Sequence, residues 1–498
     1  MEMPLLNPTK PNTVALGSDC PNHEINPQPA QKTKRPFRPQ SAVLLPELQK
    51  ANSSLTIDEN ISSWIASSHV MAGPAGTLFA GIFMEIYGRR CNIITANAMM
   101  TIGWLFIAGA QEKFMILFGR TIEGFSRCML YAGVAVIVDE LSDPKYRGFI
   151  MGCCGTFASV GILIISGLGT CVDWRTASWM AAAMSFASLV IFPCVSESPV
   201  WLVRKNRIPE ANRSLSWIWG PQHSVKATEE LLDLQQRYLH EECIGHTHQG
   251  RTGLITKIRH FFRICRSLST PSTLKPLVII LIFNIFQPIC GHSLFMFYAV
   301  DILHRMQKNN FEIIDANLET ILLSVVRLLS VTLSSFCMFR LGRREIGIIS
   351  GIGASVSGIF IAVILYMNLL EQGSPIPPRI EAWIILVLII FFIGSHSFGF
   401  YMLPALMIGE TQAAQARSTF CGCIFTITDL ILFGVLKGYH SILKSVDIHG
   451  MFLIFGISCL FCTIFIYIFL PETRKKTLME IEDYFRKQNV MWLSREKY

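Results

Sequence analysis

Glutamate and arginine recur at matching spacings in the two halves of this sequence. Glu140 is followed seven positions later by Arg147, and Glu410 is followed seven positions later by Arg417. A carboxylate and a guanidinium form charge-assisted hydrogen bonds, although one such pair at a wet surface contributes little. We expect these charges, together with Arg90, to pair with groups on the other half of the molecule. A network of such pairs that forms in one conformation and breaks in another sets a conformational equilibrium. The spacing therefore predicts a conformational switch; charges that only anchor and orient helices are the alternative.

Further charged motifs flank these two pairs in the same order. A Gly-Arg-Arg motif precedes each pair, and "SESP" and "PETR" follow the first and second pair. Three motifs in one order indicate an internal duplication, and repeated halves that rock about a midplane site produce alternating access in secondary transporters. The residues assigned to the switch are Gly88, Arg89, Arg90, Glu140, Arg147, Glu197, Arg343, Arg344, Glu410, Arg417, Glu472 and Arg474.

Long apolar segments must position these charges. The chain has 498 residues, of which 51% are hydrophobic and 16% charged, whereas soluble proteins carry nearer a quarter charged residues. The charges separate apolar runs of about 20 residues, the length that crosses a bilayer. The sequence predicts an all-α polytopic membrane protein with eleven spans, which begin near Trp64, Ile93, Phe114, Gly148, Ser178, Leu277, Leu318, Ile346, Ala382, Thr419 and Met451.

Basic residues predict the orientation of these spans. Lys and Arg collect in the loops that carry the repeated motifs, and such loops face the cytoplasm. The expected order is a polar tail over 1–60, five spans over 61–195, a cytoplasmic loop with short helices over 196–275, six spans over 276–471 and a cytoplasmic tail over 472–498. Eleven spans would place the N-terminal tail outside, whereas its own Lys and Arg favour the inside.

Longer motifs connect the sequence to a known family. "IEGFSRCMLYAGVAVIVDELSDPKYRG", preceded by Gly119 and Arg120, resembles the fourth-span signature of the sugar porters. "SESPVWL" and "LPETRKKTLMEIE" are similar to the PESPRWL and PETR motifs, and "FQPICGHSLFMFY" resembles the seventh-span motif. From about Ser54 to Lys487 the chain resembles the sugar-porter branch of the major facilitator superfamily, and most closely the insect facilitative trehalose transporters.

This resemblance implies a fold and a function. The fold would be the major facilitator fold of two pseudo-symmetric helical halves, with the first of twelve spans lacking, and Arg120 would join the switch. The expected function is transport of a sugar or similar small polar solute across the cell membrane by alternating access, either facilitative or proton-linked. No enzyme activity, cofactor, metal or nucleic-acid partner is expected; the partners are the solute and the lipid bilayer. If the tail is outside, Asn52 and Asn60 could carry glycans.

The expected pocket departs from the family. Sugar hydroxyls need amide and hydroxyl partners, because an unpaired buried polar group costs about 1–3 kcal/mol. Gln287 matches the first glutamine of the seventh-span motif, but Pro288 replaces the second glutamine and Ser293 replaces the asparagine. The positions that match the family's pocket are Gln287, Ser159, Ser293, Arg327, Thr428 and Asp429. These changes leave a second reading open, a transporter-like sensor or a non-transporting remnant with a degenerate sugar pocket.

Ionisable residues within the spans need partners. Arg327 lies ten residues into its span, and a charge so deep costs about 2.5–3.5 kcal/mol on insertion scales. Asp429 has a similar depth in another span, so we expect the two to pair, either in an anionic or proton-coupled substrate site or in a structural ion pair. His69, His292 and His396 are either proton relays or hydrogen-bonded packing residues.

Overall fold

Every regular element is a helix in the part of the chain that this computed structural model describes, namely residues 59–142, 146–244, 271–295, 298, 302–303, 316–370, 377–412, 417–474, 481 and 484–485. Within these residues, eleven segments are long and apolar enough to cross a membrane, which confirms the number of spans predicted over this part of the chain. The tail with Asn52, the side chain of Asn60 and any span that would precede Glu59 lie outside the described residues.

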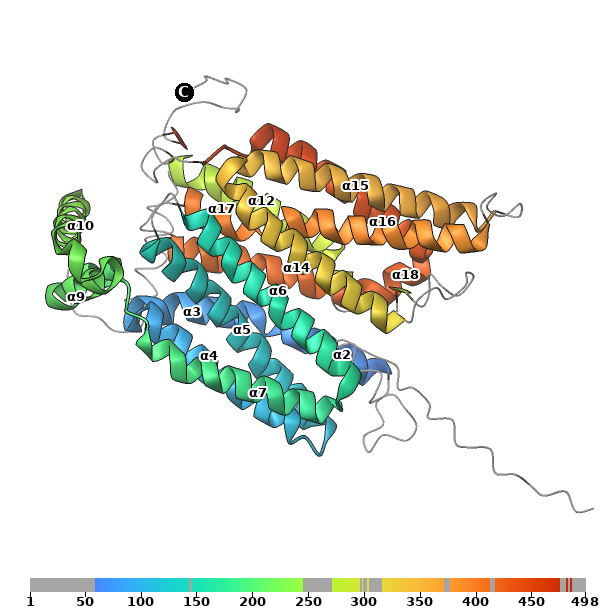
Figure 1. Ribbon diagram of the computed structural model, residues 1–498, viewed down its shortest axis with the longest axis horizontal. Coiled ribbons are helices and arrows are strands. Elements are labelled where there is room, and N and C mark those ends of the chain that lie inside the picture. Colours follow the sequence, from blue (N-terminus) through green and yellow to red (C-terminus); the bar gives the residue numbers. More distant parts are fainter. Residues whose placement is uncertain are drawn as a thin grey trace, which may run out of the picture. The chain divides into compact units, whose positions relative to one another are not determined.

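The N-terminal half contains α2 (Glu59–Met71), α3 (Gly73–Tyr87), α4 (Arg89–Ala108), α5 (Lys113–Leu141), α6 (Arg147–Cys171) and α7 (Trp174–Ile191). Helix α4 packs against α5 and α7, and α3 packs against α5 (Figure 1). The buried faces carry small apolar side chains such as Ala80, Ala96 and Ala132, so these helices approach one another closely.

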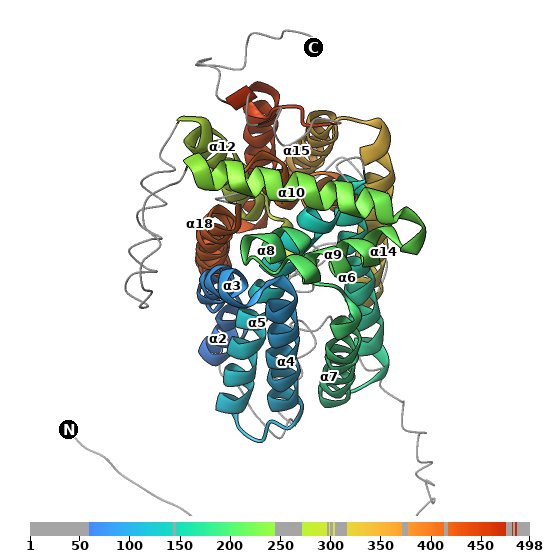
Figure 2. The same ribbon diagram turned by 90° about the vertical axis from the view of Figure 1, so that its left-hand side faces the viewer.

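Short helices follow the N-terminal half. They are η1 (Phe192–Cys194), α8 (Pro199–Arg204), α9 (Ile208–Trp219), η2 (Pro221–His223) and α10 (Ser224–Ile244). Trp201, Leu202 and Leu215 belong to a small core of their own. These helices lie at one end of the spans, and α10 crosses in front of that end in Figure 2.

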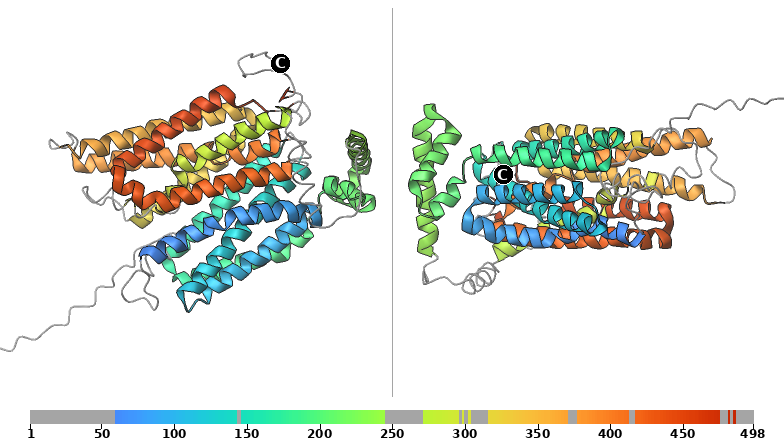
Figure 3. Two further views of the ribbon diagram at one scale, coloured as in Figure 1. Left: turned by 180° about the vertical axis from the view of Figure 1, so that it is seen from behind. Right: turned by 90° about the horizontal axis from the view of Figure 1, so that it is seen from below.

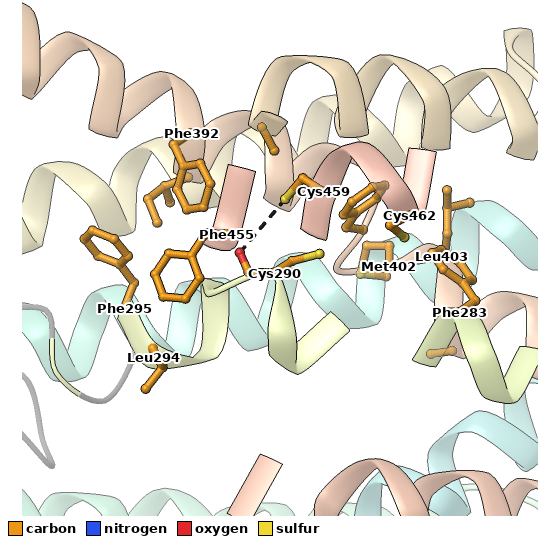
Figure 4. Packing of buried hydrophobic residues seen from close by; sticks show 14 of the residues in the cluster. Phe283, Cys290, Leu294, Phe295, Phe392, Met402, Leu403, Phe455, Cys459 and Cys462 are labelled. Atoms are coloured by element: carbon orange, nitrogen blue, oxygen red, sulfur yellow. Dashed lines mark hydrogen bonds between the residues drawn. The ribbon is translucent and has the colours of Figure 1, made fainter. Parts of the chain in front are cut away.

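The C-terminal half contains α12 (Pro271–Ile289), α14 (Ala316–Arg340), α15 (Arg343–Met367), α16 (Pro378–Phe398), α17 (Leu403–Thr411) and α18 (Arg417–Phe469). Helix α18 holds two spans, and its backbone leaves the helical region at Asp447. Helix α15 packs against α16 and α18 (Figure 3). Buried aromatic rings, among them Phe283, Phe392 and Phe455, fill the interior of this half (Figure 4).

Two equivalent contacts join the halves. Helix α6 packs along α14, and α3 packs along α18. The hydroxyls of Ser166 and Ser324 lie 3.3 Å apart at one end of the first contact, and the rings of Phe149 and Phe339 lie 4.9 Å apart at its other end. Because α3 and α14 each precede a Gly-Arg-Arg motif, the two contacts are related by the internal repeat.

Candidate functional site

Glu197 holds the start of α4. The backbone N–H groups of Arg89 and Arg90 donate to its carboxylate at 3.0 and 3.1 Å. These N–H groups have no partner within the helix, and the helix dipole favours a negative charge at this place. Gly88, the residue before the helix, has a φ of 99°, and a Cβ there would come within 2.3 Å of Glu197 Oε2. Only glycine therefore fits both the backbone and the carboxylate.

Arg89 joins the start of α4 to the end of α5. Its Nε and Nη2 each donate to the carboxylate of Glu140 at 2.9 Å, and its Nη1 donates to the Met84 carbonyl at 3.3 Å. The arginine is 2% exposed. Two parallel charge-assisted bonds fix both distance and orientation, so this buried pair locks α3, α4 and α5 together.

The C-terminal half repeats this cluster. Glu472 accepts from the backbone N–H groups of Arg343 and Arg344 at 3.1 and 3.2 Å. Arg343 Nη2 donates to Glu410 at 2.9 Å, and its Nη1 donates to the Met338 carbonyl at 3.4 Å. We call the end of the bundle that holds these two clusters the charged end. The duplication predicted from the three motifs is therefore present as one contact pattern, formed twice.

The partners of the switch charges differ from those expected. Both ion pairs join helices of one half, whereas the sequence reading placed such pairs across the two halves. Arg89 rather than Arg90 holds Glu140, because the guanidinium of Arg90 donates to the Pro193 carbonyl. Arg344 donates in the same way to the Tyr467 carbonyl. The side chains of Arg147 and Arg417 lie outside the described residues.

Two arginines of the C-terminal half reach beyond their clusters. A Cβ on Gly148, at the start of α6, would lie 2.9 Å from Arg343 Nη2. This ion pair therefore borders the N-terminal half at the charged end. Arg474 Nη2 donates to the Phe339 carbonyl at 2.7 Å and so fastens the segment after α18 to the end of α14.

Arg120 lies elsewhere in the bundle. It is twenty residues before Glu140 on α5, which is about 30 Å along the helix axis. Its Nη1 donates to Glu123 at 3.1 Å, and His69 Nδ1 lies 3.9 Å from the same carboxylate. Arg120 therefore does not join the cluster at the charged end.

Asp429 pairs with the N-terminal half. Its carboxylate accepts from Cys128 Sγ at 3.2 Å and lies 3.6 Å from Arg127 Nη2. The expected pair of Asp429 with Arg327 is therefore wrong, since the helix face of Asp429 turns towards α5. Arg127 was missed in the sequence, although a charge in the middle of a long apolar span is itself the signal.

Arg327 stacks on an aromatic ring. Its guanidinium carbon lies 4.3 Å from the centre of the Tyr401 ring, and the arginine is 4% exposed. A desolvated cation over an aromatic face is stabilised by the ring's quadrupole. Tyr401 lies in the break between α16 and α17, where its backbone N–H donates to the His396 carbonyl at 3.2 Å.

The remaining candidate residues lie on three spans. Ser159 and Thr428 are buried, and their hydroxyls donate to the carbonyls of Gly155 and Ile424 at 2.9 and 2.8 Å. Gln287 is half-buried near the end of α12, and Ser293 is half-buried just beyond it. These four side chains therefore form no hydrogen-bonded cluster with one another in this structure.

Comparisons with known proteins point in one direction. The family model described as "Sugar (and other) transporter" matches residues 36–485. The facilitated trehalose transporter Tret1 of Apis mellifera ligustica is 28% identical over 445 residues, 89% of this chain and 84% of that protein. Tret1 of Bombyx mori is 26% identical over 437 residues, 88% of this chain and 81% of that protein.

Solved structures show the same fold. The proton:xylose symporter XylE bound to 6-bromo-6-deoxy-D-glucose has a TM-score of 0.71 at 16% identity and covers 90% of this chain and 95% of its own. XylE from E. coli in a partially occluded inward-open conformation has a TM-score of 0.65 at 16% identity, with 88% and 95% covered. At such identities the likeness establishes the major facilitator fold, which confirms the fold expected from the motifs.

Proposed function

The chain belongs to the sugar transporter family, and from this membership we propose that it carries a sugar or similar small polar solute across the cell membrane by alternating access. The observation that supports this proposal is the buried ion-pair cluster at the charged end, formed once in each half. Two bodies built alike and joined by equivalent contacts can rock about a site between them.

Each cluster makes its half move as one body. In the N-terminal half, Glu197 and Glu140 tie the segment after α7 and the end of α5 to the start of α4. Glu472 and Glu410 do the same for α18, α17 and α15. Since these pairs lie within the halves, they persist during rocking, and the contacts between α6 and α14 and between α3 and α18 must change instead.

The contact of Arg127 with Asp429 crosses between the halves. Separation of the halves at this level removes the cation from the carboxylate, and an isolated buried carboxylate is stable only with a new partner or a proton. This supports a carrier in which solute or proton binding compensates the broken pair. Transport is facilitative if the solute compensates the broken pair, and it is proton-linked if a proton does.

The relatives suggest the solutes to test. The names of the two insect relatives specify trehalose, and XylE is described as a proton:xylose symporter. We propose a neutral sugar as the solute and the cell membrane as the location, with the charged end towards the cytoplasm. If the tail of residues 1–60 lies outside, Asn52 and Asn60 carry glycans, and glycosidase treatment of the protein from cells would lower its mass.

Uptake into vesicles tests the proposal. The purified full chain is reconstituted, and entry of labelled trehalose, glucose and xylose is measured with and without an inward proton gradient. We expect saturable uptake of at least one sugar. Glu140→Gln, which breaks a buried pair, should lower it strongly, whereas Glu210→Gln, which breaks the exposed pair with Arg207, should not. Absence of uptake for every sugar with folded protein would overturn the proposal.

A further inference from the structure

Two buried imidazole rings stack where two interrupted helices meet. The rings of His292 and His396 are 4.6 Å apart and tilted by only 2°, and the residues are 4% and 0% exposed. His292 follows the end of α12 at Ile289, and His396 lies just before the end of α16 at Phe398. Interrupted helices deep in a membrane protein occur where the backbone is covered by protein or lines a solute site.

The two helix breaks are built into the backbone. Gly291 has a φ of 89°, and a Cβ there would lie 2.5 Å from the Phe455 ring, so no other residue fits. The freed carbonyl of Cys290 accepts from Cys459 Sγ at 4.0 Å (Figure 4). At the second break, the backbone N–H of Phe400 donates to Ser350 Oγ at 3.1 Å. The backbone at both breaks is therefore supplied with partners.

The two imidazole rings differ from the backbone in this respect. All four ring nitrogens of His292 and His396 are buried and make no hydrogen bond within the described part of the chain. The rings of Phe392, Phe400 and Tyr401 surround them at 5.5–6.5 Å between ring centres. A buried donor or acceptor without a partner bears the full loss of its hydration, so its persistence points to a partner from outside the chain.

The hydrogen-bonding capacity of the pair matches what the expected pocket has lost. A neutral imidazole offers an N–H donor and a nitrogen acceptor, and an amide side chain likewise offers both kinds of group, although its NH2 group carries two donors. Two like charges stacked at this distance in a buried site would repel strongly. Pro288 and Ser293, which stand in place of a glutamine and an asparagine in the seventh-span motif, lie within four residues of His292. Two neutral rings thus offer two donors and two acceptors beside the place where two amides are missing.

We infer that His292 and His396 bind hydroxyl groups of the transported solute and determine its recognition. The inference rests on the proposed function and deepens it, since the solute would be a neutral polyhydroxylated molecule. In the present conformation the rings are shut off from water, so the solute reaches them when the halves rock apart. A metal ion fits less well, because the described residues contain no group of three His, Cys, Asp or Glu side chains able to hold one.

Substitutions that keep or remove the hydrogen bonds test this inference. His292→Leu and His396→Leu are each compared with the matching asparagine variants in the full chain. The readouts are uptake and the rise in Tm caused by trehalose, glucose or xylose. The leucine variants should keep their Tm without sugar, because no unpaired nitrogen remains, and lose about tenfold or more in sugar affinity. The asparagine variants should stay within about threefold of the wild type.

A control and a set of analogues sharpen the test. His449→Leu alters a histidine of the same half that faces Tyr366, 5.6 Å away between ring centres, and should leave sugar affinity unchanged. Sugar analogues that each lack one hydroxyl should be compared. The analogue whose missing hydroxyl contacts His396 should bind the wild type less tightly than the complete sugar. That loss should vanish in His396→Leu, because the partner is already gone.

The outcomes separate the two proposals. If the wild type responds to none of the three sugars, the proposed function fails and this inference fails with it. If the wild type responds and both leucine variants respond equally well, transport stands and the role of the histidines is overturned. Should the leucine variants not fold, the asparagine variants decide: retained affinity supports hydrogen bonding to the solute, and a loss of tenfold or more contradicts it.

Discussion

The two halves of the bundle are alike at the charged end and differ at the centre. At the charged end, each half holds the same cluster, in which one glutamate caps a helix and a second glutamate binds the first arginine of that helix. At the centre, Arg127 of the N-terminal half lies beside the carboxylate of Asp429 from the C-terminal half, whereas Arg327 of the C-terminal half stacks on an aromatic ring of its own half. Rocking requires two similar bodies, but one solute requires only one arrangement of side chains.

The largest expected effect tests whether the two clusters are equivalent in energy. Glu140→Gln and Glu410→Gln each leave a buried arginine without its carboxylate, so each should lower the free energy of unfolding by about 3 kcal/mol. Thermal unfolding of the purified chain in detergent measures both, with Glu210→Gln as the exposed control. If only one of these two variants lost stability, the two clusters would share a geometry but would not contribute equally to the free energy of unfolding.

Hydropathy and spacing predict the fold and the charged end well. Apolar runs of membrane-spanning length define the helices, and three motifs in one order define the repeat. Hydropathy and spacing do not predict whether Arg89 or Arg90 pairs with Glu140. Consecutive residues on a helix point about 100° apart, and only the packing of α4 against α5 decides which one faces the glutamate.

The centre is harder to predict for a related reason. Depth in the membrane suggested that Arg327 and Asp429 meet, but depth does not tell which helix faces are turned together. Likewise, Pro288 and Gly399 signal two helix breaks, while nothing in the sequence says that His292 and His396, more than a hundred positions apart, lie at the same place. Contacts of this kind depend on the assembled bundle.

A second prediction concerns the pair that crosses the halves. Arg127→Met and Asp429→Asn should each cost about 1–3 kcal/mol, less than the charged-end pairs, because the Arg127 side chain is 38% exposed. The double variant should recover much of the loss, since neither charge is then left alone. Thermal unfolding of the three variants measures this coupling. Losses that simply add would mean that the two charges do not stabilise the contact between the halves.

A third prediction separates the two glycines that precede the clusters. A Cβ at Gly88 or Gly342 would meet the capping glutamate at 2.3 or 2.2 Å, but only Gly88 has a positive φ, and Gly342 has a φ of −71°. Gly88→Ala should therefore destabilise the chain by about 1–2 kcal/mol more than Gly342→Ala, the cost of a left-handed backbone for an L-residue. Equal losses in Tm would indicate that the cost comes only from the clash of the new Cβ with the capping glutamate, and not from the backbone conformation.

The smallest expected effect concerns how the centre of the C-terminal half holds its cation. Tyr401→Phe keeps the ring under Arg327 and should change stability little, whereas Tyr401→Leu removes the ring and should cost about 1 kcal/mol beyond the loss of packing. The same pair of substitutions made in an Arg327→Met background isolates the stacking, because any difference that remains there reflects packing only. The corresponding change for the arginine of the N-terminal half, Asp429→Asn, should cost more, since it removes the full charge that the C-terminal half places next to Arg127. If Tyr401→Leu cost as much as Asp429→Asn after this correction, Arg327 and Arg127 would be held equally firmly by their different partners, and the centre would be less asymmetric than its contacts suggest.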